Sequence, residues 1–391
     1  MTAHSDAIVI GAGLIGLAIA DDLARRGLTV RVLDERVAHQ SASWAGAGML
    51  APHPESAWHE AFEQLCLRSF ERYPRFVADL IERTALDPAL RTDGVLIVAP
   101  SEPAAERLRE RVRALRAHSV DATWLDAAET RAAEPAFGTH QHGSVLVAAG
   151  GQIDNRRLLA ALEAACRNEG VVIEREAIGV HVEIEHDRVS AVRTQRGRFT
   201  AASVVNAAGA WAGRIPGVPA AAAVPVTPVK GQMLALASAL APVRRVTWLE
   251  DWYLVPREEG RLLVGATSER AQFDRRVTAG AVHGLLASVL ERLPGLSNAA
   301  LVETWAGLRP GTPDGLPYLG PTPIQGYVVA CGHYRNGILL APITAFLIAE
   351  LVAGKRVELD DGFLVGRAVR PDPEPQERLA MQPAAQGAER A

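Results

Sequence analysis

The sequence predicts an α/β fold in which strands run into glycine-bearing turns, and three observations support this. Residues 7–10 form a short apolar run that precedes a glycine-rich turn and a helical pattern over residues 14–26. A buried strand is expected at residues 203–207 and another at residues 327–330, and a glycine-bearing turn follows each of them. With a further strand at residues 28–33, the first unit is βαβ, whose parallel strands need a right-handed crossover.

The remaining elements follow from the same periodicities. Further helices are expected over residues 55–85, 102–117, 152–168 (with Asp154 or Asn155 as its cap), 281–293 and 338–353. Further strands are expected over residues 95–99, 144–148, 171–174, 178–184 and 189–194, and strands dominate residues 224–267. Residues 367–391 have almost nothing apolar to bury, so a disordered tail is expected there.

The composition is that of an ordinary globular protein. The 391 residues allow two or three domains, and a net charge of −4 favours neither nucleic acid nor an anionic membrane as partner. Three scattered cysteines suit reduced thiols, and His140 and His142 have no third ligand near them in sequence, so no metal is expected. No signal peptide is recognised, and the most apolar stretch, residues 338–353, is too short to span a membrane. We therefore expect a cytoplasmic protein.

The first turn has the sequence Gly11-Ala12-Gly13-Leu14-Ile15-Gly16. In a GxGxxG motif the first glycine permits the turn, the second lets a pyrophosphate approach the backbone, and the third lets the helix pack on the strand. The N–H groups and the positive end of the helix dipole hold the diphosphate. Asp34 ends the second strand roughly 20 residues on, where a ribose hydroxyl is expected. The sequence therefore predicts a Rossmann-like dinucleotide site.

The separated turns favour FAD over NAD as the dinucleotide. An NAD enzyme usually shows no further nucleotide-binding segment after its fingerprint. Here the strand at residues 203–207 ends in a second turn, Ala208-Gly209-Ala210-Trp211, and a third turn precedes residues 338–353. Turns far apart in the chain suit a long cofactor that discontinuous segments hold.

Three longer motifs resemble those of a known family. They are Ala45-Gly46-Ala47-Gly48-Met49-Leu50-Ala51-Pro52, Trp305-Ala306-Gly307-Leu308-Arg309-Pro310-Gly311-Thr312-Pro313-Asp314-Gly315 and Gly332-His333-Tyr334-Arg335-Asn336-Gly337-Ile338-Leu339-Leu340-Ala341-Pro342. From residue 6 to about residue 360 the chain resembles the thiamine-pathway glycine oxidases of the D-amino-acid oxidase family of FAD-dependent oxidoreductases.

The resemblance implies two domains and an oligomer. A Rossmann-like FAD-binding domain is expected from the discontinuous residues 1–85, 150–220 and 310–366. A substrate-binding α+β domain with an antiparallel sheet is expected from residues 86–149 and 221–309. The resemblance also implies a homo-oligomer, commonly a tetramer.

The resemblance further implies the residues of the site. Those expected to bind FAD are Gly11, Gly13, Leu14, Ile15, Gly16, Asp34, Glu35, Ala42, Ser43, Ala47, Gly48, Met49, Ile178, His333, Tyr334, Arg335, Asn336, Gly337, Ile338 and Leu339. Arg309 should clamp the substrate carboxylate, because a guanidinium offers it two parallel N–H donors. Arg335 and Tyr253 should lie beside it, although Tyr253 could equally be a strand aromatic in the core.

The expected reaction is the oxidative deamination of glycine and of small amines and D-amino acids, namely sarcosine, D-alanine and D-proline. A hydride passes to the flavin without a protein acid or base, and oxygen re-oxidises the flavin. The products are an imine or oxo acid, ammonia and hydrogen peroxide, and the imine can feed the thiazole of thiamine. A helix starting near Ile338 would direct its positive end at the flavin pyrimidine ring. The preferred substrate and the physiological electron acceptor stay open.

Departures from the family pattern leave the pocket size open. Asp251 and Ser268 stand where relatives can carry a histidine and a bulky apolar residue. Gly307 stands where flavin-linked sarcosine oxidases have their linking cysteine, so the FAD is expected to be non-covalent.

Other enzymes of the same fold remain alternatives. They are a D-amino-acid oxidase or dehydrogenase, a sarcosine oxidase and a hydrogen-cyanide-forming glycine dehydrogenase subunit. A non-catalytic or tRNA-modifying flavoprotein is the alternative from another class, and it would need basic grooves or cysteines that this sequence does not offer.

Overall fold

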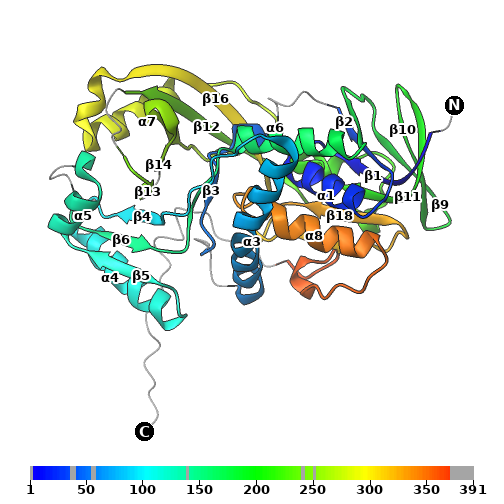
Figure 1. Ribbon diagram of the computed structural model, residues 1–391, viewed down its shortest axis with the longest axis horizontal. Helices are drawn as coiled ribbons and strands as arrows, with labels where there is room; N and C mark the ends of the chain where they lie inside the picture. The colour runs from blue at the N-terminus through cyan, green and yellow to red at the C-terminus, as the bar shows by residue number, and fades with distance from the viewer. Residues whose placement is uncertain are drawn as a thin grey trace, which may run out of the picture.

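The computed structural model describes residues 3–35, 41–53, 59–137, 141–238, 243–249 and 252–369. They form two lobes, each built on an eight-stranded sheet, on the right and left of Figure 1. A third, two-stranded antiparallel sheet consists of β3 (Met49–Leu50) and β7 (Gly151–Gln152).

The sheet of the first lobe is parallel at its centre. Its parallel strands lie in the order β18 (Tyr327–Cys331), β11 (Gly197–Asn206), β1 (Ala3–Ile10), β2 (Val30–Asp34) and β8 (Val172–Arg175). Its antiparallel additions are β17 (Tyr318–Pro321) on β18, β10 (Arg188–Thr194) on β11, and β9 (His181–Glu185) on β10. Because parallel strands end at the same edge, the turns after β1, β2, β11 and β18 meet there.

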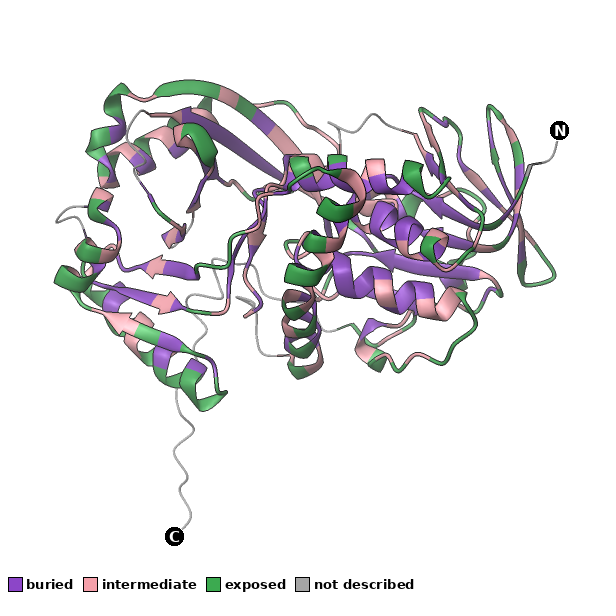
Figure 2. Ribbon diagram, in the orientation of Figure 1, coloured by how far each residue is buried: buried purple, intermediate pink, exposed green. Residues whose placement is uncertain are grey.

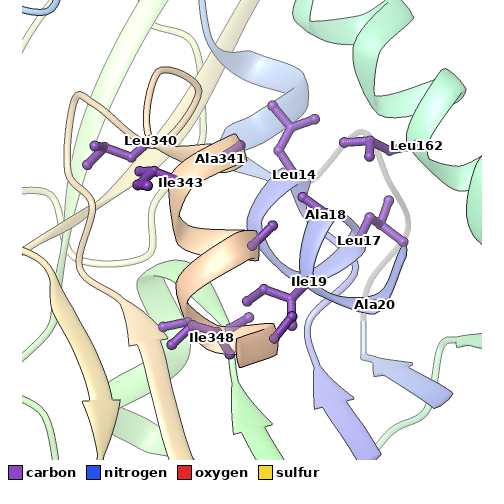
Figure 3. Packing of buried hydrophobic residues seen from close by; sticks show 14 of the residues in the cluster. Leu14, Leu17, Ala18, Ile19, Ala20, Leu162, Leu340, Ala341, Ile343 and Ile348 are labelled. Atoms are coloured by element: carbon purple, nitrogen blue, oxygen red, sulfur yellow. The ribbon is translucent and has the colours of Figure 1, made fainter. Parts of the chain in front are cut away.

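Four helices cover one face of this sheet. They are α1 (Leu14–Arg25), α3 (Glu60–Thr84), α6 (Asn155–Asn168) and α8 (Ala341–Val352). In Figure 3, α1 lies between α8 and α6, with Leu17 and Ile19 of α1, Ile348 of α8 and Leu162 of α6 in one core. Figure 2 shows α8 buried along most of its length, which explains why its sequence is apolar nearly all round.

The sheet of the second lobe is antiparallel apart from one pair. Its order is β16 (Ala300–Gly311), β12 (Thr227–Ala237), β15 (Arg261–Gly265), β14 (Trp252–Pro256), β13 (Val246–Leu249), β4 (Val95–Val98), β6 (Ser144–Val147) and β5 (Ala122–Leu125), with β13 and β4 parallel. The helices of this lobe are α4 (Glu102–Ala117), α5 (Ala127–Ala133) and α7 (Ala279–Arg292). Leu285 and Val289 of α7 pack on Leu234 and Leu254 of the sheet.

The α/β class agrees with the sequence prediction, but several expected element bounds are wrong. The helix expected over residues 152–168 begins at Asn155, and its expected cap is confirmed, because the Asp154 carboxylate accepts two backbone N–H groups there. The strand expected from Ile178 begins at His181. The helix expected near Ile338 begins three residues later.

The first residue of the expected C-terminal tail is bonded to the first lobe. Arg367 donates from Nε to Asp314 at 2.7 Å, and its guanidinium lies 3.5 Å from the centroid of the Tyr318 ring. This side chain is therefore anchored to the first lobe. The rest of the expected tail from residue 370, and His140 of the histidine pair, lie outside the described residues.

Within the described ranges, no helix is long and apolar enough to cross a membrane. The same part of the chain holds no group of three or more His, Cys, Asp or Glu side chains placed to bind a metal ion.

Candidate functional site

The glycine-rich turn connects β1 to α1 at the carboxyl edge of the first sheet. Gly11 has φ +108°, and a β-carbon there would lie 2.5 Å from the carbonyl oxygen of Ala207. At Gly16 a β-carbon would lie 1.9 Å from the Gly11 carbonyl oxygen, so only glycine lets the helix approach the turn. Gly13 caps α1 without a side-chain hydrogen bond. The turn therefore presents the positive end of α1 to an anion.

Two acidic side chains at the end of β2 hold neighbouring backbone. The Asp34 carboxylate accepts the N–H of Ala12 at 2.7 Å, which orients the glycine turn. The Glu35 carboxylate accepts the N–H groups of Gly179 and Val180 at 3.1 and 2.9 Å. Glu35 thereby fixes the chain that leads into β9 beside the end of β2.

A second segment, which consists of α2 (Ala42–Ala45) and β3, crosses the glycine turn. The Ser43 hydroxyl accepts the N–H of Leu14 at 2.9 Å and so joins α2 to the first turn of α1. At Gly48, with φ +71°, a β-carbon would lie 1.9 Å from the carbonyl oxygen of Ile153. The segment therefore lies tightly between the glycine turn and β7.

Side chains from the second lobe hold carbonyl groups of this segment. Trp305 donates from Nε1 to the Ala45 carbonyl at 2.8 Å, and Arg257 donates from Nη2 to the Ala47 carbonyl at 2.6 Å. Burial lowers the pKa of Arg257 to about 10, so it stays charged at neutral pH. The two lobes are thus joined at the segment expected to contact the flavin.

Arg309 projects from β16 of the second sheet toward this region. Its Nη1 donates to the Thr267 carbonyl at 3.1 Å. A β-carbon on Gly231 of β12 would lie 2.4 Å from the same Nη1. The guanidinium is therefore held over bare backbone, with one N–H group occupied by Thr267.

Tyr253 lies on β14, opposite Gly265 of β15. A β-carbon on Gly265 would lie 2.7 Å from the tyrosine ring, and the phenol lies 3.7 Å from Sδ of Met233. The ring packs on an apolar cluster and also lines the cleft described below. Tyr253 is therefore both a core aromatic of the strand and a residue that lines the cleft.

The loop between β18 and α8 begins with a buried histidine. His333 is 2% exposed, and its Nε2 lies 3.1 Å from the Thr344 hydroxyl. Burial lowers the pKa of His333 to about 3. The imidazole is therefore neutral throughout the range in which enzymes work.

Tyr334 and Arg335 follow in the same loop. Tyr334 has φ +47°, and its N–H donates to the Pro310 carbonyl at 3.1 Å. The Arg335 guanidinium carbon lies 5.3 Å from the centroid of the Tyr334 ring. Burial raises the pKa of the Tyr334 phenol, but Arg335, with smaller contributions from Arg309 and Ser268, brings that pKa below its usual value.

One cleft of 2230 Å³ connects these elements. Pockets for drug-sized ligands measure about 300–1,000 Å³, so this cleft has room for a dinucleotide and a small substrate together. It runs from the glycine turn and Asp34, past Ser43 and Met49, to Arg309.

The position of Gly307 bears on how a flavin would be attached. A β-carbon on Gly307 would lie 2.5 Å from the β-carbon of Ala45. A cysteine at this position would need α2 to move. The glycine cradle, the length of the cleft and the closed position at Gly307 together fit FAD held without a covalent bond.

Most residues expected in the site do line the cleft. They are Gly11, Gly13, Ile15, Asp34, Glu35, Ala42, Ser43, Ala47, Gly48, Met49, Tyr253, Arg309, His333, Tyr334, Arg335, Asn336, Gly337 and Ile338.

Four expected residues are not among those that line it. Leu14 and Leu339 are core residues, each 1% exposed, and Gly16 faces the turn backbone. Ile178 is 52% exposed, and Val180, held by Glu35, lines the cleft instead. Asp251 lies outside the described residues.

The sequence analysis also missed an aromatic wall of the cleft. Trp211 and Phe273 line it with ring centroids 5.4 Å apart, and Trp248 lies 6.0 Å from Tyr253. Trp211 ends the second glycine-bearing turn, which was the one available signal. Phe273 and Trp248 carry no motif and come to the cleft through tertiary packing.

Comparisons with known proteins agree with this geometry. The family described as FAD dependent oxidoreductase matches residues 6–351. A glycine oxidase of Pseudomonas aeruginosa is 35% identical over 357 residues, which cover 90% of this chain and 96% of that protein. The crystal structure of glycine oxidase from Geobacillus kaustophilus is 34% identical with a TM-score of 0.88, and the match covers 94% of this chain and 100% of that one.

A longer relative matches as well. The bifunctional protein ThiO/ThiG of Synechocystis sp. is 39% identical over 364 residues, which cover 91% of this chain and 53% of that protein. The chain thus spans about half the length of this relative. The match over residues 6–351 covers most of the chain, and the chain therefore belongs to the family of FAD-dependent oxidoreductases and is an FAD-dependent enzyme.

Proposed function

We propose that the protein oxidises glycine and other small amines and D-amino acids, with sarcosine, D-alanine and D-proline as further substrates. The products are hydrogen peroxide and an imine, and hydrolysis of the imine gives an oxo acid with ammonia from glycine and D-alanine and methylamine from sarcosine, whereas D-proline gives a cyclic imine. The imine from glycine would serve thiamine thiazole synthesis. The observation that carries the proposal is the Arg309 guanidinium, which lines the same cleft as the glycine cradle and is held over Gly231. The names of the similar proteins, glycine oxidase and ThiO/ThiG, support the same reaction.

The residues around the glycine turn would hold FAD. Gly11 and Gly13 would receive its diphosphate at the N-terminus of α1, and Asp34 and Glu35 would lie near its ribose. The segment of Ala47 to Met49 and the loop of His333 to Ile338 would contact the flavin ring. When bound, FAD supplies the redox chemistry, accepting a hydride from the substrate and passing the electrons to oxygen.

The second sheet would orient the substrate. Arg309 would pair with the carboxylate through the N–H groups that Thr267 leaves available, and this fixes orientation as well as charge. Arg335 and Tyr253 would lie beside it and restrict how the α-carbon is presented to the flavin.

The loop of His333 to Ile338 contains no carboxylate, and its one imidazole cannot serve as a base. His333 is buried, bonded to Thr344 and neutral, so it cannot exchange protons with the substrate. The Tyr334 phenol interacts with the guanidinium groups of Arg335 and Arg309 and would help to order them. The substrate amine, deprotonated, supplies the electron push itself.

The proposal includes the attachment of the cofactor. Because Gly307 has no room for a cysteine beside Ala45, FAD should not be covalently bound. Acid precipitation should release all yellow colour as free FAD. Flavin that stays with the precipitated protein would contradict this.

The division of labour and the assembly are proposed on the resemblance. Residues 1–85, 150–220 and 310–366 would bind FAD, and residues 86–149 and 221–309 would bind the substrate, although β16 runs on to Gly311 across that boundary. A homotetramer in the cytoplasm is proposed on the same basis. Light scattering of the purified holoenzyme measures the oligomer directly.

Initial rates of peroxide release test the proposed function. Glycine, sarcosine, D-alanine and D-proline should each give peroxide, and L-alanine should give none. A holoenzyme that releases no peroxide with any of the four substrates would overturn the proposal.

A further inference from the structure

The loop from β18 to α8 ends in a helix start that its own backbone completes only in part. In a regular helix the Ile338 carbonyl would accept the N–H of residue 342, but that residue is Pro342, which has no N–H. The Ile338 carbonyl instead accepts the N–H of Ala341 at 3.2 Å, and the i to i−4 bonds of α8 begin with the N–H of Thr344, which donates to the Leu340 carbonyl at 3.0 Å. The Leu339 carbonyl therefore needs a donor from outside the turn, and the Ile338 carbonyl can accept a second one.

Two hydroxyl groups of α3 supply them. The Tyr73 phenol donates to the Ile338 carbonyl. The Ser69 hydroxyl donates to the Leu339 carbonyl at 2.6 Å and accepts the N–H of Ile343 at 3.3 Å. Ser69 thus stands between a carbonyl and an N–H that would otherwise bond each other. Spaced four residues apart, the two side chains lie on one face of α3.

Both hydroxyl groups are shielded from water. Ser69 and Tyr73 are 0% exposed, and Leu339 is 1% exposed. Burial raises the pKa of the Tyr73 phenol far above its usual value, so it is always a donor. A carbonyl that loses a donor at this depth cannot replace it with water, so removing either hydroxyl should displace the backbone rather than leave it in place.

The backbone that these hydroxyls hold faces the cleft. Ile338 lines the cleft, and its Cδ1 lies 2.8 Å from the place of a β-carbon on Gly46, at the end of α2. Arg335 lies three residues before Ile338 in the same loop. A shift of Ile338 would therefore move both the flavin-side segment and the loop that bears Arg335.

We infer that Ser69 and Tyr73 are positioning residues, which set the loop of residues 333–340 against the cofactor by completing the broken first turn of α8. The inference rests on the proposed function only in that this loop contacts FAD. Neither side chain lines the cleft itself, so both act through the backbone of Ile338 and Leu339.

The test measures FAD release from the full-length holoenzyme by the rise of flavin fluorescence on dilution. Ser69→Ala and Tyr73→Phe should each speed release by about tenfold, the size expected when one buried hydrogen bond to the loop is lost. Two matched controls remove hydroxyls elsewhere. Thr84→Val acts on the same helix, where Thr84 bonds Leu80, and Tyr327→Phe removes a buried phenol that bonds Asn206. Both controls should stay within about twofold of wild type.

A rescue separates positioning from simple loss of packing. Pro342→Ala restores a backbone N–H that can donate to the Ile338 carbonyl. The double variant Tyr73→Phe/Pro342→Ala should therefore release FAD at close to the wild-type rate. Pro342→Ala should not rescue Ser69→Ala, because Ser69 bonds the carbonyl of Leu339 and not that of Ile338. Hydrogen exchange over residues 338–344 should rise in the single variants and fall again in the rescued one.

Two results would overturn the inference: wild-type release rates in both Ser69→Ala and Tyr73→Phe, or equal acceleration in the controls with no rescue by Pro342→Ala. If Tyr73→Phe does not fold, the FAD-release rate of Ser69→Ala and its hydrogen exchange over residues 338–344 test the inference. Failure of the proposed function would look different. The wild-type holoenzyme would then yield no peroxide, while the FAD-release rates of the variants would still follow the expected pattern.

Discussion

The Arg309 guanidinium lies over the α-carbon of Gly231, where a β-carbon would stand 2.4 Å from Nη1. The two residues come from neighbouring antiparallel strands, in which Gly231 pairs with Gly307 and Arg309 pairs with Val229. The absence of a side chain at 231 therefore gives the guanidinium its place, and the Thr267 carbonyl fixes its rotation.

Gly231→Ala should push the guanidinium away from this place. The backbone at 231 is an ordinary strand, so the main effect should be on substrate binding and not on folding. We expect the Michaelis constant for glycine to rise by about tenfold, because small displacements of a clamp are costly. Gly280→Ala, where no atom lies within 4 Å of the added methyl, is the matched control. An unchanged Michaelis constant in Gly231→Ala would mean that Arg309 does not need this position.

Arg309→Ala should raise the Michaelis constant far more than the glycine variant. A desolvated carboxylate left without its partner costs on the order of 2–5 kcal/mol. Arg309→Lys should restore only part of this, because an ammonium group cannot make the forked contact. Steady-state kinetics with glycine measure both effects. Wild-type affinity in the alanine variant would show that Arg309 is not the clamp.

His333 should make the protein less stable in acid. Its pKa is lowered to about 3 by burial, whereas the unfolded chain binds a proton near pH 6.5. Between these values the unfolded state holds more protons, so the free energy of unfolding falls as pH drops, by up to about 1.4 kcal/mol per pH unit. His333→Gln should remove this slope, and His283→Gln, at an exposed site on α7, should keep it. Urea unfolding at fixed FAD concentration between about pH 7 and pH 5 measures it. Equal slopes in wild type and His333→Gln would contradict the account.

Ser268 should leave room for substrates larger than glycine. It lines the cleft and contacts the Tyr334 phenol. Sarcosine, D-alanine or D-proline should therefore be oxidised at least as efficiently as glycine. Ser268→Met should shift the preference toward glycine by roughly 1–3 kcal/mol, and Ser297→Met, at an exposed position, should not. Specificity constants for glycine and D-proline decide this, and an unchanged ratio would remove Ser268 from the pocket.

Much of the fold, and most residues that line the cleft, could be predicted because the signals are local. The glycine motif, the acid after the second strand and the motif around Arg309 each lie within a few residues, and a chain with parallel strands brings their ends to one edge. Ile178 does not line the cleft, because Glu35 holds the neighbouring backbone and Val180 lines the cleft there.

The features that were missed depend on tertiary contacts. Gly231 has no motif, and its role appears only when β12 pairs with β16. The helix near Ile338 starts later because Pro342 and two hydroxyls from α3 interrupt its first turn, and no local pattern links α3 to that loop. Trp248 and Phe273 reach the cleft in the same way.

The reaction itself is tested most directly by mixing the holoenzyme with substrate in the absence of oxygen and following the flavin absorbance. The account predicts that glycine, sarcosine, D-alanine and D-proline bleach the flavin at rates no slower than turnover, and that L-alanine does not. Admitting oxygen should restore the absorbance and release about one hydrogen peroxide per flavin. A flavin whose absorbance is unchanged by all four substrates would contradict the central claim that this cleft oxidises small amines and D-amino acids.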